Sequence, residues 1–223
     1  MTRTTNARVA GFTFLLYIAL GIAAMVLAGR AGNAEGIAAQ LAGVSQHASA
    51  VRLAAVVNLT TGFAALILAV TLYALTRDED QDLAMLALTC RVAEGVIGGI
   101  AIQRSLGLLW LATAAGASGA NTETTNALGA FLMGQRWSFV IGAMFFAVGS
   151  TLFCWLLLRG RMIPTVLAWL GVLASVLLVV LLPLQIADVL PGPVIQFMWL
   201  PMAAFEIPLG LWLIMKGVAV PAR

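Results

Sequence analysis

Three charged residues stand within long apolar runs of the chain, where charge is expensive. Arg91 and Glu94 lie three residues apart and therefore share one face of a helix. Glu206 lies in a separate apolar run, between Pro201 and Pro208. A guanidinium can hold an anionic group, and a carboxylate can serve as its counter-ion or carry a proton. These residue types point to ion pairing, ligand binding or proton movement in an apolar environment.

The segments around these charges have the length of transmembrane helices, and the three charges share one depth in them. If the third span begins at Leu83, Arg91 lies ~12 Å and Glu94 ~16 Å inside it. Counting back from Lys216, Glu206 lies ~15 Å from the same edge. We therefore predict that Arg91 contacts Glu94, Glu206 or both. A charge near the bilayer centre costs about 2.5–3.5 kcal/mol, so such a group is expected to face a partner or a cavity.

Three further polar residues are secondary candidates for this site. Arg104 lies toward the outer end of the third span, and Asn58 lies in the outer half of the second. Asp188 follows the fifth span. Arg104 either joins the polar site or reaches outward to Asp188, Gln185 or a lipid phosphate. The outward reach is favoured, because long basic side chains extend toward the membrane surface.

The sequence offers little for catalysis beyond these charges. The single histidine, His47, lies in a predicted polar segment, and Cys90 and Cys154 read as small buried hydrophobic residues. HExxH, CxxC, Walker and G-x-S-x-G motifs are absent from the sequence. We therefore assign no catalytic residue, no metal site and no cofactor.

Composition identifies the solvent of this chain as lipid. Of its 223 residues, 62% are hydrophobic and 9% charged, and the mean hydropathy is +1.03. Soluble domains carry about a quarter charged residues, so this chain cannot coat a water-soluble globule. The net charge of +3 comes from basic residues scattered near helix ends, which argues against nucleic acid as a partner.

Hydrophobic segments of about 20 residues, each long enough to cross ~30 Å of hydrocarbon, recur along the chain. The fold class is predicted to be all-α: a single polytopic bundle over residues 1–223, with six transmembrane helices. The first span is too long for the ~7–15-residue core of a cleaved signal. The spans are expected at about 9–28, 53–75, 83–112, 137–158, 165–186 and 194–215, with an outer amphipathic segment at about 33–50.

Basic residues in the loops predict the orientation. With both termini in the cytoplasm, the outer side holds Arg30, Arg52 and Arg136. The inner side then holds a larger set: Arg3, Arg8, Arg77, Arg159, Arg161, Lys216 and Arg223. Because cytoplasmic loops carry the excess of Lys and Arg, both termini are predicted to be cytoplasmic, in a plasma membrane.

Several motifs give the chain a family resemblance. They are Arg8-Val9-Ala10-Gly11, Leu72-Tyr73-Ala74-Leu75, Cys90-Arg91-Val92-Ala93-Glu94, Arg159-Gly160-Arg161-Met162-Ile163-Pro164 and the closing segment from Glu206 to Gly217. The chain resembles, over nearly its whole length, the bacterial membrane family called domain of unknown function 4386. The resemblance implies a six-helix protein of the bacterial inner membrane and supplies no established activity.

Three functions are compatible with the sequence. The first is binding or transport of a small amphiphile, lipid or ion in a cavity lined by Arg91, Glu94 and Glu206. The second is a non-catalytic structural or regulatory subunit, whose buried charges only specify helix register and partners. The third, an enzyme acting on lipid, is remote, because Arg91 would keep both carboxylates ionised and so unsuited to acid–base work. Membrane lipids are expected partners, and a small amphiphilic ligand and a homo- or hetero-oligomer stay open.

Overall fold

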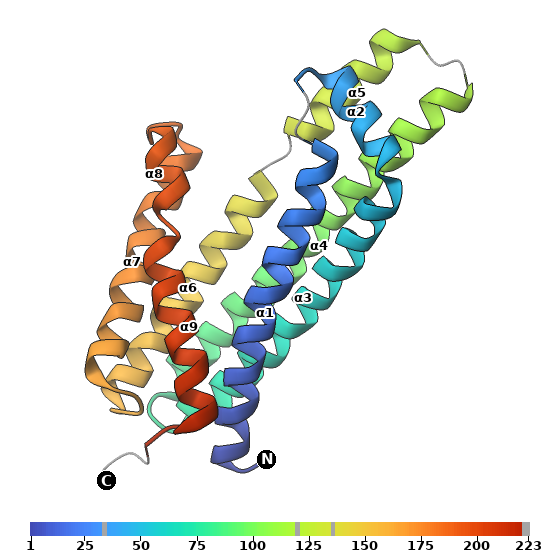
Figure 1. Cartoon of the computed structure of the whole chain (residues 1–223). Helices are drawn as coiled ribbons and strands as arrows, with labels where there is room; N and C mark the ends of the chain where they lie inside the picture. The colour runs from blue at the N-terminus through green and yellow to red at the C-terminus, as the bar shows by residue number, and fades with distance from the viewer. Residues whose placement is uncertain (33–34, 119–120, 135–136, 220–223) are drawn as a thin grey trace. The chain divides into compact units, whose positions relative to one another are not determined.

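The computed structural model describes residues 1–32, 35–118, 121–134 and 137–219. Two residues of the orientation argument, Arg136 and Arg223, lie outside the described residues, as does the side chain of Arg30. Within the described part the regular elements are all α-helices, and they are shown in Figure 1. In chain order they are α1 (Arg3–Gly32), α2 (Ile37–Gln46), α3 (Ala48–Thr76), α4 (Gln81–Ser118), α5 (Thr122–Gly134), α6 (Trp137–Arg159), α7 (Thr165–Ile186), α8 (Gly192–Phe197) and α9 (Leu200–Met215).

Six helical segments of the described chain are long and apolar enough to cross a membrane. They are Arg3–Gly29, Ala48–Thr76, Gln81–Ala114, Thr122–Arg159, Thr165–Ile186 and Gly192–Met215. Many large apolar side chains on these helices are exposed, including Phe63, Val96 and Leu173, as expected where lipid is the solvent. The prediction of an all-α protein with six spans is confirmed, and the protein is an integral multi-pass membrane protein.

The chain divides into two compact units. Unit 1 comprises residues 1–17, 63–96 and 140–223, and unit 2 comprises residues 18–62 and 97–139. The helices α1, α3, α4 and α6 contribute residues to both units. The prediction of a single bundle with the boundaries 1–223 stays a prediction.

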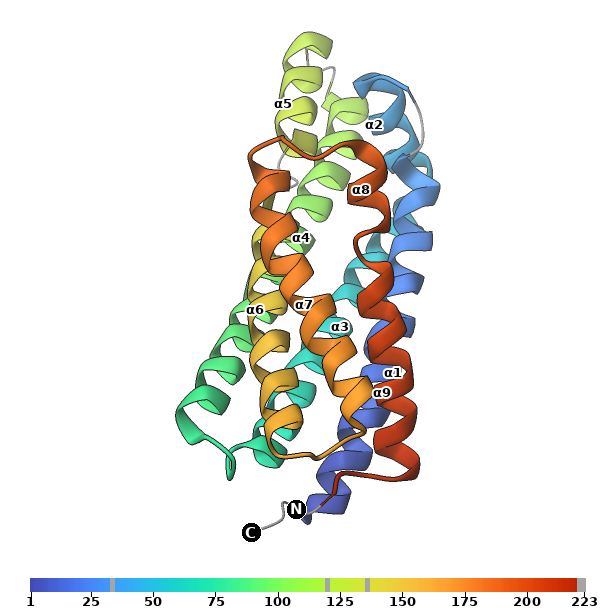
Figure 2. The same cartoon turned by 90° about the vertical axis from the view of Figure 1, so that its left-hand side faces the viewer.

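Close helix approaches at glycines hold unit 1 together. A Cβ added to Gly11 of α1 would lie 2.5 Å from the carbonyl oxygen of Gly210 in α9. A Cβ on Gly171 of α7 would lie 2.5 Å from the ring of Phe205 in α9 and 2.7 Å from Sγ of Cys154 in α6. Figures 1 and 2 show α7 and α9 side by side. Small residues of this kind let apolar helices pack by close contact, which is the main attraction available in lipid.

Charged residues gather at the end of unit 1 where α1 begins and α9 ends (Figures 1 and 2). Arg3 pairs with Asp78 at 3.8 Å, and Arg159 pairs with Glu79 and with Asp80 at 3.4 Å each. Asp80 also begins α4, since its Oδ1 accepts a hydrogen bond from the Leu83 amide at 3.1 Å. The acidic turn of Asp78, Glu79 and Asp80 therefore links α1, α4 and α6.

Pro201 and Pro208 have different effects on the last span. Pro201 lies in the first turn of α9, where a missing amide hydrogen costs nothing. It therefore stands at the start of a helix, after the turn that follows α8. Pro208 lies inside α9, where it removes one helical hydrogen bond. Glu206 lies on the same helix, two residues before Pro208.

In unit 2, the helix α2 lies within the predicted amphipathic segment and contacts α5. Leu41 and Val44 of α2 are buried. Leu41 Cδ1 lies 3.0 Å from the place of a Cβ on Gly129 of α5. The apolar face of α2 is thus covered at least in part by another helix. Its place on the membrane surface stays a prediction.

Candidate functional site

Arg91 is the most enclosed charged side chain of unit 1. It lies in α4, and only 2% of its side chain is exposed. Its Nη1 lies 2.9 Å from Oε2 of Glu94, one helical turn further along. The predicted contact between Arg91 and Glu94 is therefore confirmed. The spacing of three residues that suggested a common face places the two charges in direct contact.

Two aromatic rings and a glycine complete the enclosure of Arg91. The guanidinium carbon lies 4.6 Å from the ring centre of Phe146 in α6 and 5.7 Å from that of Tyr17 in α1. Both distances are within the range of cation–π attraction. A Cβ on Gly149 would lie 3.1 Å from Cγ of Arg91, so the glycine makes room for the aliphatic stem. The Arg91 guanidinium is therefore stabilised by protein groups, since only 2% of the side chain is exposed.

Both carboxylate oxygens of Glu94 are engaged. The Tyr17 hydroxyl donates a 2.8 Å hydrogen bond to Oε1, while Oε2 faces Arg91. The Nη1–Oε2 contact lacks the alignment of a hydrogen bond, and Nε of Arg91 also has no hydrogen-bond acceptor among the described residues. The pair is thus held by charge and packing, with one directed hydrogen bond from Tyr17.

Sequence reasoning missed Tyr17 and Phe146, although a signal for Tyr17 was present. Tyr17 lies eight residues after Val9, the expected edge of the first span, which puts it ~12 Å deep. That is the depth expected for Arg91. A hydroxyl at the depth of a buried ion pair is a natural hydrogen-bond donor to it. Phe146 carries no comparable signal, because apolar residues fill its helix.

Glu206 is the second carboxyl of the cluster. It lies in α9, is 6% exposed, and its Oε1 has no hydrogen-bond donor among the described residues. It is within electrostatic range of Arg91, which attracts it, and of Glu94, which repels it. Cys154 of α6 is buried within electrostatic range of Glu206 and Arg91. One guanidinium therefore serves two carboxyls, and it makes its close contact with Glu94.

The secondary candidates are dispersed. Arg104 and Asn58 belong to unit 2, and the Asn58 side chain is exposed. Asp188 belongs to unit 1, is exposed, and has a left-handed backbone with φ 57° just after α7. The predicted reach of Arg104 to Asp188 or Gln185 stays a prediction, as does any part of these residues in the polar site.

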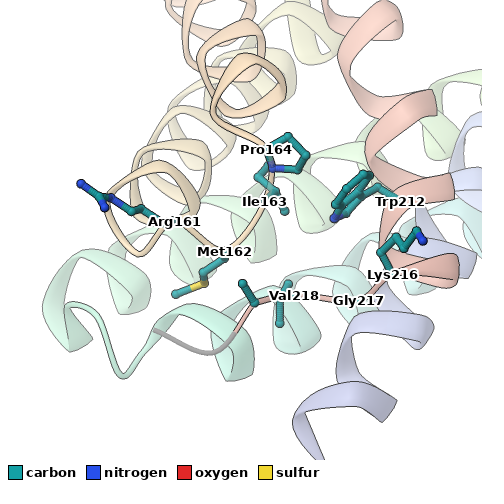
Figure 3. Close-up of a pocket in the computed structure, with 9 residues that line it drawn as sticks. Arg161, Met162, Ile163, Pro164, Trp212, Lys216, Gly217 and Val218 are labelled. Atoms are coloured by element: carbon teal, nitrogen blue, oxygen red, sulfur yellow. The ribbon is translucent and has the colours of Figure 1, made fainter. Parts of the chain in front are cut away.

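The described residues include no group of three or more His, Cys, Asp or Glu side chains placed to hold a metal ion. An open cavity of about 390 Å³ lies in unit 1 at the loop between α6 and α7 and the end of α9. It is lined by Arg161, Trp212 and Lys216 among others, and not by the Arg91 cluster (Figure 3).

The family model described as "Domain of unknown function (DUF4386)" matches residues 9–217. The chain belongs to the DUF4386 family. The resemblance inferred from the sequence motifs is confirmed, and Arg91, Glu94 and Glu206 all lie within the matched range of this DUF4386 protein. No curated protein and no solved structure matches the chain significantly. Family membership therefore supports the fold and leaves the activity to be argued from the site.

Proposed function

We propose that this protein binds an ion, either a proton or a small cation, at an intramembrane polar site centred on Glu206, and carries it in the membrane. One observation supports this most. Glu206 is 6% exposed, with a carboxylate oxygen that lacks a hydrogen bond among the described residues. A buried carboxylate oxygen without a hydrogen-bond donor is expensive, and intramembrane ionisable residues generally mark ion or proton routes.

Charge balance favours a positive ligand over an anionic one. Arg91 already contacts Glu94 and lies against Tyr17 and Phe146. An anion would have to displace Glu94 from a packed site. With all three groups ionised, the cluster of Arg91, Glu94 and Glu206 carries one negative charge in excess. A proton or a monovalent cation on Glu206 cancels that excess, because burying net charge is costly.

The arrangement assigns a different task to each group. Arg91, Glu94 and Tyr17 form a fixed polar wall, since they contact one another directly. Glu206 approaches from α9, near the hydrogen bond that Pro208 removes. Irregular backbone at membrane depth is generally tolerated where protein covers it or a cavity lies beside it. Glu206 is thus the group that binds and releases the ion. The membrane we propose is a plasma membrane, with both termini of the chain in the cytoplasm.

The test is ion flux into vesicles that contain the purified full chain. A pH-sensitive dye inside the vesicles reports proton entry, and a sodium-sensitive dye reports the cation arm, both under an imposed membrane potential. We expect one of the two signals to exceed that of empty vesicles and to be lost in Glu206→Gln. Glu123→Gln, an exposed carboxyl on α5, is the matched control and should retain the signal. Wild-type vesicles as tight as empty ones in both arms would remove the proposal.

A second function, that of a structural or regulatory subunit, is favoured by the packing of the ion pair. Arg91 is almost fully enclosed by its neighbours, and Gly149 fits its stem. A buried pair of this kind can serve only to fix helix register and partner choice. This alternative predicts that the chain purifies with a stoichiometric protein partner. It further predicts that Glu206→Gln changes assembly with that partner and no ion flux.

A further inference from the structure

We propose that the cavity between the α6–α7 loop and the end of α9 binds the headgroup of an anionic phospholipid, through Arg161 and Lys216. This site is separate from the Arg91 cluster and goes beyond the proposed ion site. The cavity volume of about 390 Å³ lies within the ~300–1,000 Å³ typical of small-molecule sites.

The two cations of the cavity differ from three other basic residues at this end of unit 1. Arg3, Arg77 and Arg159 each pair with an acidic residue of the turn before α4. Arg161 and Lys216 pair with no carboxylate among the described residues, and the nine residues that line the cavity include no acid. Both side chains are exposed. The cavity is therefore a place of uncompensated positive charge.

Arg161 holds this position in a backbone conformation that usually belongs to glycine. Its φ is 48°, in the left-handed region. The α6 helix ends in a Schellman motif: the Met162 amide donates to the Leu157 carbonyl at 3.0 Å, and the Arg161 amide donates to that of Leu158 at 3.0 Å. Arg161 occupies the place after the cap where glycine avoids strain. A strained non-glycine residue is a recurring mark of a functional position.

The far wall of the cavity is built by a second left-handed turn. Gly217, with φ 71°, ends α9 and donates to the Trp212 carbonyl at 3.2 Å. The turn directs Val218 and Ala219 back toward the loop, where the Ala219 amide donates to the Met162 carbonyl at 2.9 Å. The segment 218–219 is thus hydrogen-bonded to the α6–α7 loop. It places Lys216 across the cavity from Arg161 (Figure 3).

Position and lining identify the occupant as a lipid. The cavity lies where the spans Thr122–Arg159 and Gly192–Met215 end and Thr165–Ile186 begins, at the level of headgroups. Its lining is largely apolar, and Trp212 is half-buried there, as tryptophans at the membrane interface are. In Figure 3 both charged ends point away from the centre of the cavity. Exposed side chains change rotamer within nanoseconds, so both can turn toward one phosphate.

The experiment titrates the full chain, in a neutral detergent, with phosphatidylglycerol or phosphatidylcholine and counts bound lipids by native mass spectrometry. We expect the wild type to prefer phosphatidylglycerol. Arg161→Gly and Lys216→Gln should each weaken that binding about fivefold, the effect of removing one cation near an anionic lipid. Arg77→Gln removes one exposed cation from the same end without touching the cavity. It should leave the affinity unchanged.

Arg161→Gly also separates binding from folding. Glycine adopts φ 48° without strain, so the melting temperature of this variant in lipid-free detergent should equal or exceed that of the wild type. Added phosphatidylglycerol should raise the melting temperature of the wild type more than that of the variant. Equal affinities in wild type and the Arg161→Gly/Lys216→Gln double variant would overturn the proposal. So would equal binding of the two lipids, or displacement of phosphatidylglycerol by inorganic phosphate at equal concentration.

Discussion

Removal of the two partners of the buried ion pair should have unequal effects on stability. Arg91→Met leaves Glu94 and Glu206 without a cation, although both were within range of one. Glu94→Gln keeps a side chain of the same shape beside Arg91 and leaves Glu206 as its counter-ion. The first change creates uncompensated negative charge, and the second brings the cluster to neutrality. We expect Arg91→Met to be the more destabilising variant.

The magnitude follows from the geometry. At an N–O distance of 2.9 Å and an effective dielectric constant of about 20, Coulomb attraction is about 6 kcal/mol before the cost of desolvation is subtracted. Breaking a buried pair by removing one partner typically costs about 3–5 kcal/mol. We assign that cost to Arg91→Met. For Glu94→Gln we expect about 1–3 kcal/mol, the cost of weakened polar contacts while Glu206 still compensates Arg91.

The assay is the free energy of unfolding in mixed micelles, measured by titration with a denaturing detergent for both single variants and the double variant. The double variant should be less destabilised than the sum of the single variants, because the second change removes a group that the first left unpaired. Glu123→Gln, exposed on α5, controls for the loss of a carboxylate. A Glu94→Gln variant as unstable as Arg91→Met would refute the reasoning, since Glu206 would then contribute no charge balance.

Two further predictions concern the surroundings of the pair. Gly149→Ala should lower the free energy of unfolding by about 1–3 kcal/mol, because its Cβ would lie 3.1 Å from Cγ of Arg91; Gly98→Ala, where a Cβ meets nothing within 4 Å, should change it little in the same denaturation assay. Tyr17→Phe removes the 2.8 Å hydrogen bond to Glu94 and should cost about 1.5–3 kcal/mol, measured in the same way. A Tyr17→Phe variant as stable as wild type would mean that the hydroxyl contributes nothing net to the buried pair.

Much of the fold was predictable because lipid imposes simple rules on sequence. An apolar run of about 20 residues must be helical, since no water is present to satisfy its backbone. The same rule, applied to depth, predicted the contact between Arg91 and Glu94. The way α9 begins was harder to predict, because Pro201 both breaks one helix and starts another. Sequence spacing alone does not distinguish these two outcomes.

The surroundings of the site were less predictable, because they depend on which faces of different helices meet. Phe146 and Gly149 are ordinary residues in an apolar helix, and only packing shows that both contact Arg91. The cavity at Arg161 depends on two left-handed turns, at Arg161 and Gly217. Glycine at a helix end is a familiar signal for such a turn. An arginine is not such a signal, so the turn at Arg161 was not predictable from the residue type.

The spacing of Phe146 and Gly149 explains why Arg91 makes its close contact with Glu94. Three residues apart, they lie on the same face of α6, with Gly149 against the stem of Arg91 and Phe146 over its guanidinium. This face holds Arg91 in the position where it contacts Glu94, which Tyr17 also binds. The Oε1 atom of Glu206 has no hydrogen-bond donor among the described residues. Under the proposed function, Glu206 is the group on which a proton or cation costs least, because binding to its Oε1 breaks no hydrogen bond among the described residues.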